Sequence, residues 1–225
     1  SWPVGFQHQF ICAICSGICE VVVREGTTEA SGHAQSTQNS EEEGPVLFSR
    51  TVQTMLEYCR ETPGRRYTLL YRTIWILSQT AMRGGELLNL KWSEVQEKKI
   101  RITSTEDWEV KDRKDAWVPI SPKLQEEMSQ WDKSGEVWVL DRGNGDRHWA
   151  HLNELTASMR FIQNKTDCRG PKPLHGFRAG VATELLRQGA SPVHVQRLLR
   201  HEDLSTTMGY LDPNELEIEN LVKNL

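Results

Sequence analysis

The sequence contains no long uninterrupted run of apolar residues, and it contains few cysteines. None of its apolar stretches reaches the roughly 18–20 residues that a membrane-spanning helix needs. The apolar piece FICAIC (10–15) has no basic region ahead of it, as a secretory signal would have. Five cysteines in 225 residues do not make a disulfide framework. We therefore expect no membrane association and an intracellular, cytoplasmic setting.

A large excess of basic residues is also missing. The net charge is −4, with 37% hydrophobic and 26% charged residues, which is typical of a globular protein with one good-sized core. The acidic residues are unevenly distributed, however. Residues 1–45 carry six glutamates and one arginine, and residues 212–225 are acidic as well. The part between them has more basic than acidic residues, which is compatible with a polyanionic partner.

Large apolar residues are absent from residues 26–45, GTTEASGHAQSTQNSEEEGP. Such a composition is typical of a linker that packs into no core. We expect an irregular amino-terminal segment and acidic linker over residues 1–45. A single domain is expected to follow over residues 46–225.

A histidine and three cysteines near the amino terminus are of types that bind zinc. On one helix, His8, Cys12, Cys15 and Cys19 would form a straight stripe, which cannot surround a tetrahedral ion. A zinc knuckle would need a second pair of ligands, and the neighbouring sequence has none. We expect neither a metal site here nor a cofactor elsewhere in the chain.

The apolar pattern beyond the linker is mostly helical. Apolar residues recur three and four positions apart from Phe48 to Cys59 and again from Leu69 to Leu77. In the middle of the chain, KKIRITS (98–104), AWVPI (116–120) and EVWVL (136–140) predict short strands. Helical patterns then return. The expected fold class is mainly α with a small antiparallel β-sheet (α+β).

Several polar residues stand where helices are expected to begin or end. Arg83 precedes two glycines at a break between helical runs, with Glu86 within reach of an ion pair. His175 and Arg178 are three apart, so they share one face of a helix that opens near residue 174. Each of these residues has an ordinary structural interpretation as a solvated surface group.

The same holds for the residues that follow. His201 ends the helical stretch SPVHVQRLLRH, where an imidazolium suits the helix dipole. Ser205 or Thr206 is expected to cap a further short helix that bears Tyr210. Taken alone, Tyr210 is interpreted equally well as a core or surface aromatic.

Considered together, these residues form a pattern that resembles the tyrosine recombinase family, also called phage integrases. Its first box, an arginine followed by S/G-E-L-x-x-L-x-W, is similar to RGGELLNLKW (83–92), and its second, H-x-x-R, to HGFR (175–178). Its closing segment, a tyrosine nine residues after a histidine, is similar to LLRHEDLSTTMGY (198–210). Its hairpin lysine stands seven residues before a V-P-hydrophobic strand, which from Val118 leads to Lys111. The order and spacing agree over about residues 46–212.

The resemblance implies a recombinase or integrase that cleaves and rejoins DNA strands through a 3′-phosphotyrosyl link, without metal. The implied catalytic residues are Arg83, Lys111, His175, Arg178, His201 and Tyr210. Two guanidiniums suit the phosphate oxygens. A neutral imidazole can take the proton of a phenol, and an ammonium can protonate the leaving 5′ oxygen. Lys114 remains an alternative to Lys111 as that general acid.

The chain also departs from the family pattern. Ala179 stands where the family often has histidine, and Arg200 stands where glycine commonly precedes the histidine of the closing segment. Residues 1–45 are too short and too irregular for the family's helical DNA-clamping domain. We therefore expect either that such a domain belongs to a longer chain or that this is a short member of the family.

The resemblance implies double-stranded DNA as the partner and a tetramer assembled on it through the carboxyl-terminal helix. Leu216, Leu221, Val222 and Leu225 make an apolar stripe that suits this role, although packing on its own domain would explain it equally well. Two other functions stay open. One is a type IB topoisomerase-like or telomere-resolving enzyme, and the other is a non-catalytic DNA-binding relic of the fold.

Overall fold

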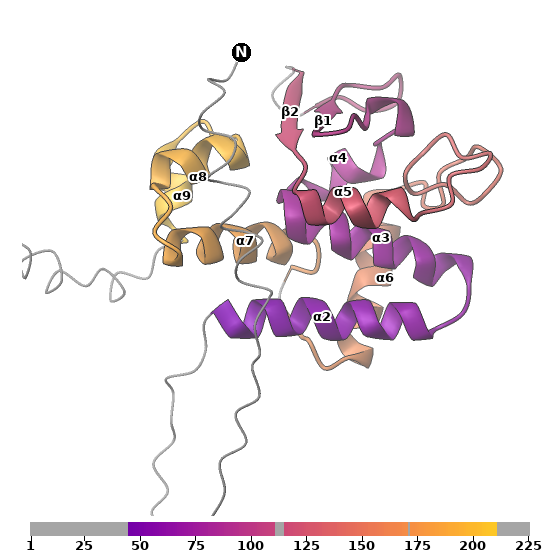
Figure 1. The fold of residues 1–225 in the computed structure, drawn as a ribbon, viewed down its shortest axis with the longest axis horizontal. Helices are drawn as coiled ribbons and strands as arrows, with labels where there is room; N and C mark the ends of the chain where they lie inside the picture. The colour runs from indigo at the N-terminus through magenta and orange to yellow at the C-terminus, as the bar shows by residue number, and fades with distance from the viewer. Residues whose placement is uncertain (1–44, 111–114, 171, 211–225) are drawn as a thin grey trace, which may run out of the picture.

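The computed structural model describes residues 45–110, 115–170 and 172–210. Figure 1 shows their arrangement. The amino-terminal segment with its histidine and cysteines, both candidate lysines and the apolar tail lie outside these ranges, so the expectations about them stay predictions. The elements in chain order are α2 (Pro45–Glu61), α3 (Arg65–Thr80), α4 (Gly84–Leu88), the 3₁₀ turn η1 (Trp92–Glu94), β1 (Lys99–Ile102), β2 (Ala116–Pro119), α5 (Pro122–Ser129), α6 (Leu152–Lys165), α7 (His175–Arg187), α8 (Pro192–Leu199) and α9 (Leu204–Met208).

Helix α3 is the centre of the core. From Leu69 to Thr80 every residue except Tyr71 is buried. Helix α2 packs along one side of α3, while α5 and α7 contact it elsewhere, and Figure 1 shows α3 between α2 and the layer that holds the strands and α5. The apolar spacing of α2 and α3 was sufficient to predict both helices, because apolar residues recur three and four positions apart in each.

The two strands pair in antiparallel fashion, with Ile100 opposite Val118. Both of these side chains are fully buried, whereas their neighbours in each strand are exposed or half-buried. The described part of the chain is therefore mainly helical with a small antiparallel sheet. This confirms the fold class expected from the sequence.

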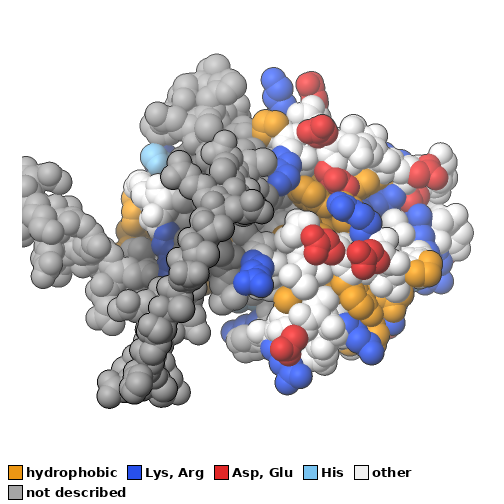
Figure 2. All heavy atoms as spheres, turned by 60° about the horizontal axis from the view of Figure 1, so that its bottom comes forward, with side chains coloured by type: hydrophobic (Ala, Val, Ile, Leu, Met, Phe, Trp, Pro, Cys, Tyr) orange, Lys and Arg blue, Asp and Glu red, His pale blue; other side chains and the backbone are white. Residues whose placement is uncertain are grey.

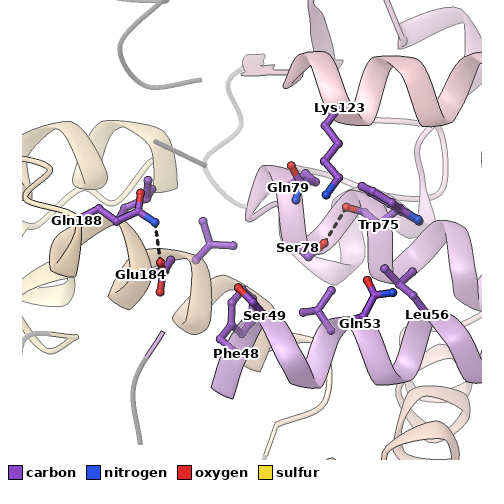
Figure 3. A pocket seen from close by; sticks show the side chains of 13 residues that line it. Phe48, Ser49, Gln53, Leu56, Trp75, Ser78, Gln79, Lys123, Glu184 and Gln188 are labelled. Carbon is purple, nitrogen blue, oxygen red and sulfur yellow. Dashed lines mark hydrogen bonds between the residues drawn. The ribbon is translucent and has the colours of Figure 1, made fainter. Parts of the chain in front are cut away.

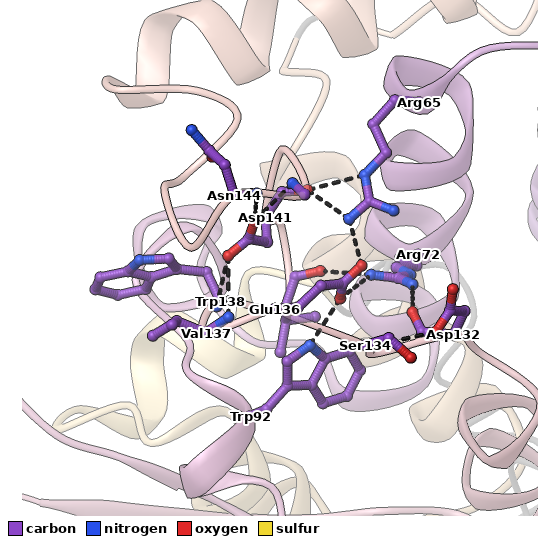
Figure 4. Close-up of polar contacts among 12 residues, drawn as sticks. Arg65, Arg72, Trp92, Asp132, Ser134, Glu136, Val137, Trp138, Asp141 and Asn144 are labelled. Atoms are coloured by element: carbon purple, nitrogen blue, oxygen red, sulfur yellow. Dashed lines mark hydrogen bonds and ion pairs between the residues drawn. The ribbon is translucent and has the colours of Figure 1, made fainter.

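The prediction of a third strand at residues 136–140 is wrong. Residues 136–140 form only an isolated bridge, between Trp138 and Lys91. The carboxylate of Asp141 accepts the backbone N–H groups of Val137 (3.0 Å) and Trp138 (3.3 Å), as Figure 4 shows. Backbone donors held by a side chain in a turn are not available for a sheet ladder, so the apolar alternation here does not produce a strand.

Glu136, at the start of the same segment, anchors it to α3 through ion pairs (Figure 4). Its carboxylate pairs with Arg65 and with the buried Arg72, the latter at 2.7 Å, and accepts a hydrogen bond from the indole of Trp92 at 2.9 Å. A buried guanidinium is tolerated only where such partners compensate for its lost hydration. This network holds the irregular segment in place without a sheet.

A second, smaller apolar cluster lies beside the main core and is formed by residues of α7 and α8 together with Ala81 at the end of α3. Phe48 of α2 packs against this cluster at Gly180. A Cβ at Gly180 would lie 2.3 Å from atoms of the Phe48 ring, so only glycine allows α2 and α7 to approach this closely.

The ends of α8 and α9 differ in detail from the sequence prediction. Helix α8 begins at Pro192, as the Ser-Pro sequence predicts, but it ends at Leu199, two residues before His201. The cap of α9 is Asp203, whose carboxylate accepts the backbone N–H of Ser205. Asp203 precedes the hydroxyl residues and offers a charged acceptor, which makes it the stronger cap for a helix N-terminus.

Candidate active site

The break between α3 and α4 carries the first of the expected site residues. Ala81 ends α3 in the left-handed conformation (φ 52°), and Arg83 precedes α4. The carboxylate of Glu86 accepts the backbone N–H of Arg83 at 2.8 Å and its guanidinium at 3.1 Å. These two hydrogen bonds, both donated to Glu86, keep the Arg83 side chain, which is one-quarter exposed, at the start of α4.

Arg178 lies in the first turn of α7 and is almost completely buried, at 3% exposure. Its guanidinium donates to the carbonyl oxygen of Ala81 at 2.7 Å and also to the carbonyl oxygen of Leu199. Both are carbonyls at helix C-termini, which carry partial negative charge. Burial, reinforced by the charges of Arg83 and Arg200, lowers the pKa of Arg178 to about 10. Its side chain thereby joins the ends of α3 and α8.

Arg200 is the residue that follows α8, and it completes a cluster of three guanidiniums around one carboxylate. Its Nη2 lies 2.6 Å from Oε2 of Glu86, and its carbonyl oxygen accepts a hydrogen bond from Arg83 at 3.4 Å. Burial alone would raise the pKa of Glu86, but the charges and hydrogen bonds of Arg200 and Arg83 outweigh it and leave that pKa below its usual value. The cluster therefore contains three cations and one anion, a composition suited to binding a further anion.

Three further site residues meet at the edge of this cluster. The ring of His201 stacks on that of Tyr210, with centroids 6.2 Å apart, and its Nδ1 lies 2.9 Å from the hydroxyl of the buried Thr207. The hydroxyl of Tyr210 lies 3.5 Å from Nε2 of His175, the first residue of α7. Burial, together with the charges of Lys172 and Arg178, lowers the pKa of His175, which favours a neutral imidazole at neutral pH.

Five of the six expected site residues are thus within the described part of the chain, and the fold brings them together. Lys111 and its alternative Lys114 lie outside the described residues. The sequence also pointed to the Glu86 ion pair. It gave no role to Arg200, whose signal was only a departure from a family pattern, or to Thr207, whose signal was its place between a histidine and a tyrosine.

The described residues contain no cluster of histidine, cysteine or acidic side chains that could hold a metal ion. None of the helices in the described ranges has the length and apolar character needed to traverse a bilayer. On the face drawn in Figure 2, acidic and basic side chains are interspersed over the described surface rather than gathered by sign.

A groove lies apart from these residues, and it contains none of them. Figure 3 shows it between α2, α3 and the second half of α7, with Lys123 of α5 at its edge. Its apolar lining includes Phe48, Val52, Leu56, Trp75, Val181 and Leu185.

Several solved structures of recombinases and integrases share this arrangement of helices and strands. The XerA recombinase matches with a TM-score of 0.59 and 21% identity, over 78% of this chain and 63% of that one. The XerH recombinase bound to a palindromic difH substrate matches with a TM-score of 0.62 and 20% identity, over 77% of this chain and 51% of that one. The catalytic domain of bacteriophage HP1 integrase matches with a TM-score of 0.53 and 22% identity, over 77% and 90%. At these identities the likeness establishes the fold.

The sequence profile of the phage integrase family matches residues 45–217, so the chain belongs to that family. A tyrosine recombinase XerC of Oceanobacillus iheyensis is 31% identical over 109 residues, which are 44% of this chain and 36% of the relative. A tyrosine recombinase of Thermosipho africanus is 27% identical over 156 residues, 68% of this chain and 52% of the relative. The chain spans between 34% and 56% of the lengths of the curated relatives it matches.

Proposed function

We propose that this chain is the catalytic part of a site-specific recombinase or integrase that cuts and rejoins strands of double-stranded DNA. The observation that carries the proposal is the contact between the Tyr210 hydroxyl and Nε2 of His175, beside a cluster of three arginines. A phenol needs a base to become a nucleophile, and the arginines supply the positive charge that a phosphodiester requires.

In the proposed reaction the oxygen of Tyr210 attacks phosphorus while the bond from phosphorus to the 5′ oxygen breaks. The proton of the phenol passes to His175, whose lowered pKa favours the neutral form that can accept it. The leaving 5′ oxygen takes a proton from Lys111, or from Lys114. The covalent phosphotyrosine retains the bond energy, so a second 5′ hydroxyl can reverse the step and rejoin strands without a nucleotide cofactor.

In this reaction the charge on the non-bridging phosphate oxygens is stabilised by Arg83, Arg178 and His201. A guanidinium has five N–H donors, and Arg178 uses two of them for the carbonyls of Ala81 and Leu199. Its fixed orientation is an advantage, because donors that need no reorganisation stabilise a transition state most strongly. Thr207 holds Nδ1 of His201, which orients the other ring nitrogen for a phosphate oxygen.

DNA rather than RNA is the expected polymer, because a ribose 2′-hydroxyl next to a 3′-phosphotyrosyl bond would attack it and release the enzyme. Contacts with the DNA backbone should make binding fall steeply with salt. A topoisomerase-like or telomere-resolving enzyme would use the same chemistry. A non-catalytic relic would have no chemical need for the pairing of Tyr210 with His175.

A nicked duplex that traps the covalent intermediate tests the proposal. We expect the chain, incubated with a pool of nicked duplexes of varied sequence, to form a protein–DNA adduct that survives denaturation, and Tyr210→Phe to form none. Sequencing the trapped DNA would identify the site. Absence of any adduct from the wild-type chain, or an undiminished adduct with Tyr210→Phe, would refute the assignment of the nucleophile.

We further propose that copies of the chain assemble on DNA, as a tetramer, by docking residues 212–225 of one copy on a neighbour. The apolar stripe of that segment needs an apolar surface, and the groove between α2, α3 and α7 supplies one. Val52→Glu in the groove and Leu221→Asp in the segment should each leave one-protomer complexes on DNA and remove the larger ones in gel-shift and sedimentation experiments. Val193→Glu changes an exposed apolar residue outside the groove and is the control. Assembly of both variants at the wild-type level would exclude this mode of association.

A further inference from the structure

The backbone of Arg200 is left-handed, with φ 55° and ψ 45°. Glycine adopts this conformation freely, whereas a residue with a Cβ is disfavoured in it, which is why glycine commonly terminates helices in this way. Within the described ranges only two other non-glycine residues, Ala81 and Asp167, have positive φ. The backbone at position 200 would therefore favour glycine over arginine.

The Arg200 side chain carries a second unfavourable feature. Its Nε is buried and has no hydrogen-bond partner among the described residues. A buried donor without an acceptor is destabilising. Two such costs at one residue are difficult to explain by stability alone, and they direct attention to what the rest of the guanidinium contacts.

Those contacts converge on the turn that carries Arg83. The side chain of Arg200 is 15% exposed, and its guanidinium reaches Oε2 of Glu86, whose side chain is 2% exposed. The carbonyl of Arg200 accepts a hydrogen bond from the Arg83 guanidinium. Arg200 therefore contacts the turn in two ways, once through the carboxylate that caps it and once through the arginine itself.

We propose that Arg200 is a positioning residue, which holds Arg83 in place for phosphate through Glu86. Without Arg200, the whole charge of the buried carboxylate would fall on Arg83 and draw its guanidinium toward the protein interior. With Arg200 present, Glu86 divides its two oxygens between two arginines, and Arg83 remains at the edge of the cluster, where it is one-quarter exposed. This role rests on the function proposed above.

Arg200→Gly tests the proposal, because glycine keeps the backbone conformation and removes only the side chain. In single-turnover cleavage of the nicked duplex at saturating DNA, we expect the rate constant to fall about 10–100-fold, since a displacement of 1 Å at a reacting group costs about 100-fold. DNA affinity should change by no more than about threefold, because a single charge is lost. Arg200→Lys, which can still pair with Glu86, should recover part of the rate.

Arg197→Ala is the matched control. It removes an exposed arginine from the last turn of α8, just before Arg200, and should leave the cleavage rate near that of the wild-type chain. Thermal unfolding of each variant establishes that it is folded at the assay temperature. A purely structural role for Arg200 would lower the melting temperature and leave the rate per folded molecule unchanged, which would overturn the proposal.

Other outcomes of these experiments would also overturn it. If Arg200→Gly lost affinity in proportion to rate, Arg200 would contact DNA directly rather than act through Glu86. If the wild-type chain formed no adduct, the proposed function itself would fail, and the role of Arg200 with it. An adduct from the wild-type chain together with an equally fast Arg200→Gly would remove this inference alone.

Discussion

Glu86→Gln is the change that most directly tests the arrangement of the arginine cluster. The substitution keeps the shape of the side chain and one oxygen acceptor but removes the negative charge shared by Arg83 and Arg200. Removing one partner of a buried ion pair costs about 3–5 kcal/mol. Because the Arg83 side chain is one-quarter exposed and partly hydrated, we expect the lower end, about 3 kcal/mol. In a domain of this size that corresponds to a fall in melting temperature of roughly 6–12 °C.

The loss should also depend on pH. The pKa of Glu86 is lowered in the folded chain, so its contribution to stability is present above the unfolded value near ~4.3 and is lost as the pH falls through the lower folded value. The difference between wild type and Glu86→Gln should therefore be constant at neutral pH and shrink in acid.

Chemical denaturation at pH 7 and at low pH measures both effects. Glu126→Gln, an exposed glutamate in α5, is the control and should change the free energy of unfolding by no more than about 0.5 kcal/mol. A similarly small change for Glu86→Gln would refute the reasoning, since the carboxylate could then not be the buried partner of two arginines.

Two further predictions concern the proton transfers. The cleavage rate should be constant near neutral pH and fall in acid with a midpoint below ~6.5, because burial, Lys172 and Arg178 lower the pKa of His175. Lys172→Gln should move that midpoint upward, and a wild-type midpoint above ~6.5 would contradict the assignment of the base. For the general acid, Lys111→Ala should cleave an ordinary phosphodiester poorly and recover on a substrate with sulfur at the 5′ bridging position, because a thiolate leaves without a proton. Recovery of Lys114→Ala alone would transfer the role to that lysine.

Much of the fold was predictable because each long helix carries its own pattern. The apolar spacing of α2 and α3 and the start of α8 at Ser-Pro are local features, and local features can be read from sequence. For residues 136–140 the same reasoning predicted a strand, and that prediction was wrong. The apolar residues of this segment alternate as in a strand, but the carboxylate of Asp141 accepts the backbone N–H groups of Val137 and Trp138 that a strand would need for pairing. The apolar pattern of the sequence does not reveal this hydrogen bonding.

The candidate site was predictable as a set of residues but not as a network. Motif order identified five described residues, and the fold brings them into one region: Arg83, His175, Arg178, His201 and Tyr210. The partners of Arg178 are backbone carbonyls at two helix ends, which no side-chain pattern encodes. Arg200 was visible only as an unexpected residue in place of glycine, and its contact with Glu86 joins positions 114 residues apart.

The site also lies at the seam between the two apolar clusters of the core. Ala81 and Leu199, whose carbonyls Arg178 holds, belong to the smaller cluster, while Leu87 and Leu88, which follow Glu86 in α4, belong to the larger one. A phosphate bound by both Arg83 and Arg178 would link these two apolar clusters. Substrate engagement should therefore stiffen α8 and α9 as a unit, which slower amide hydrogen exchange in these helices would register.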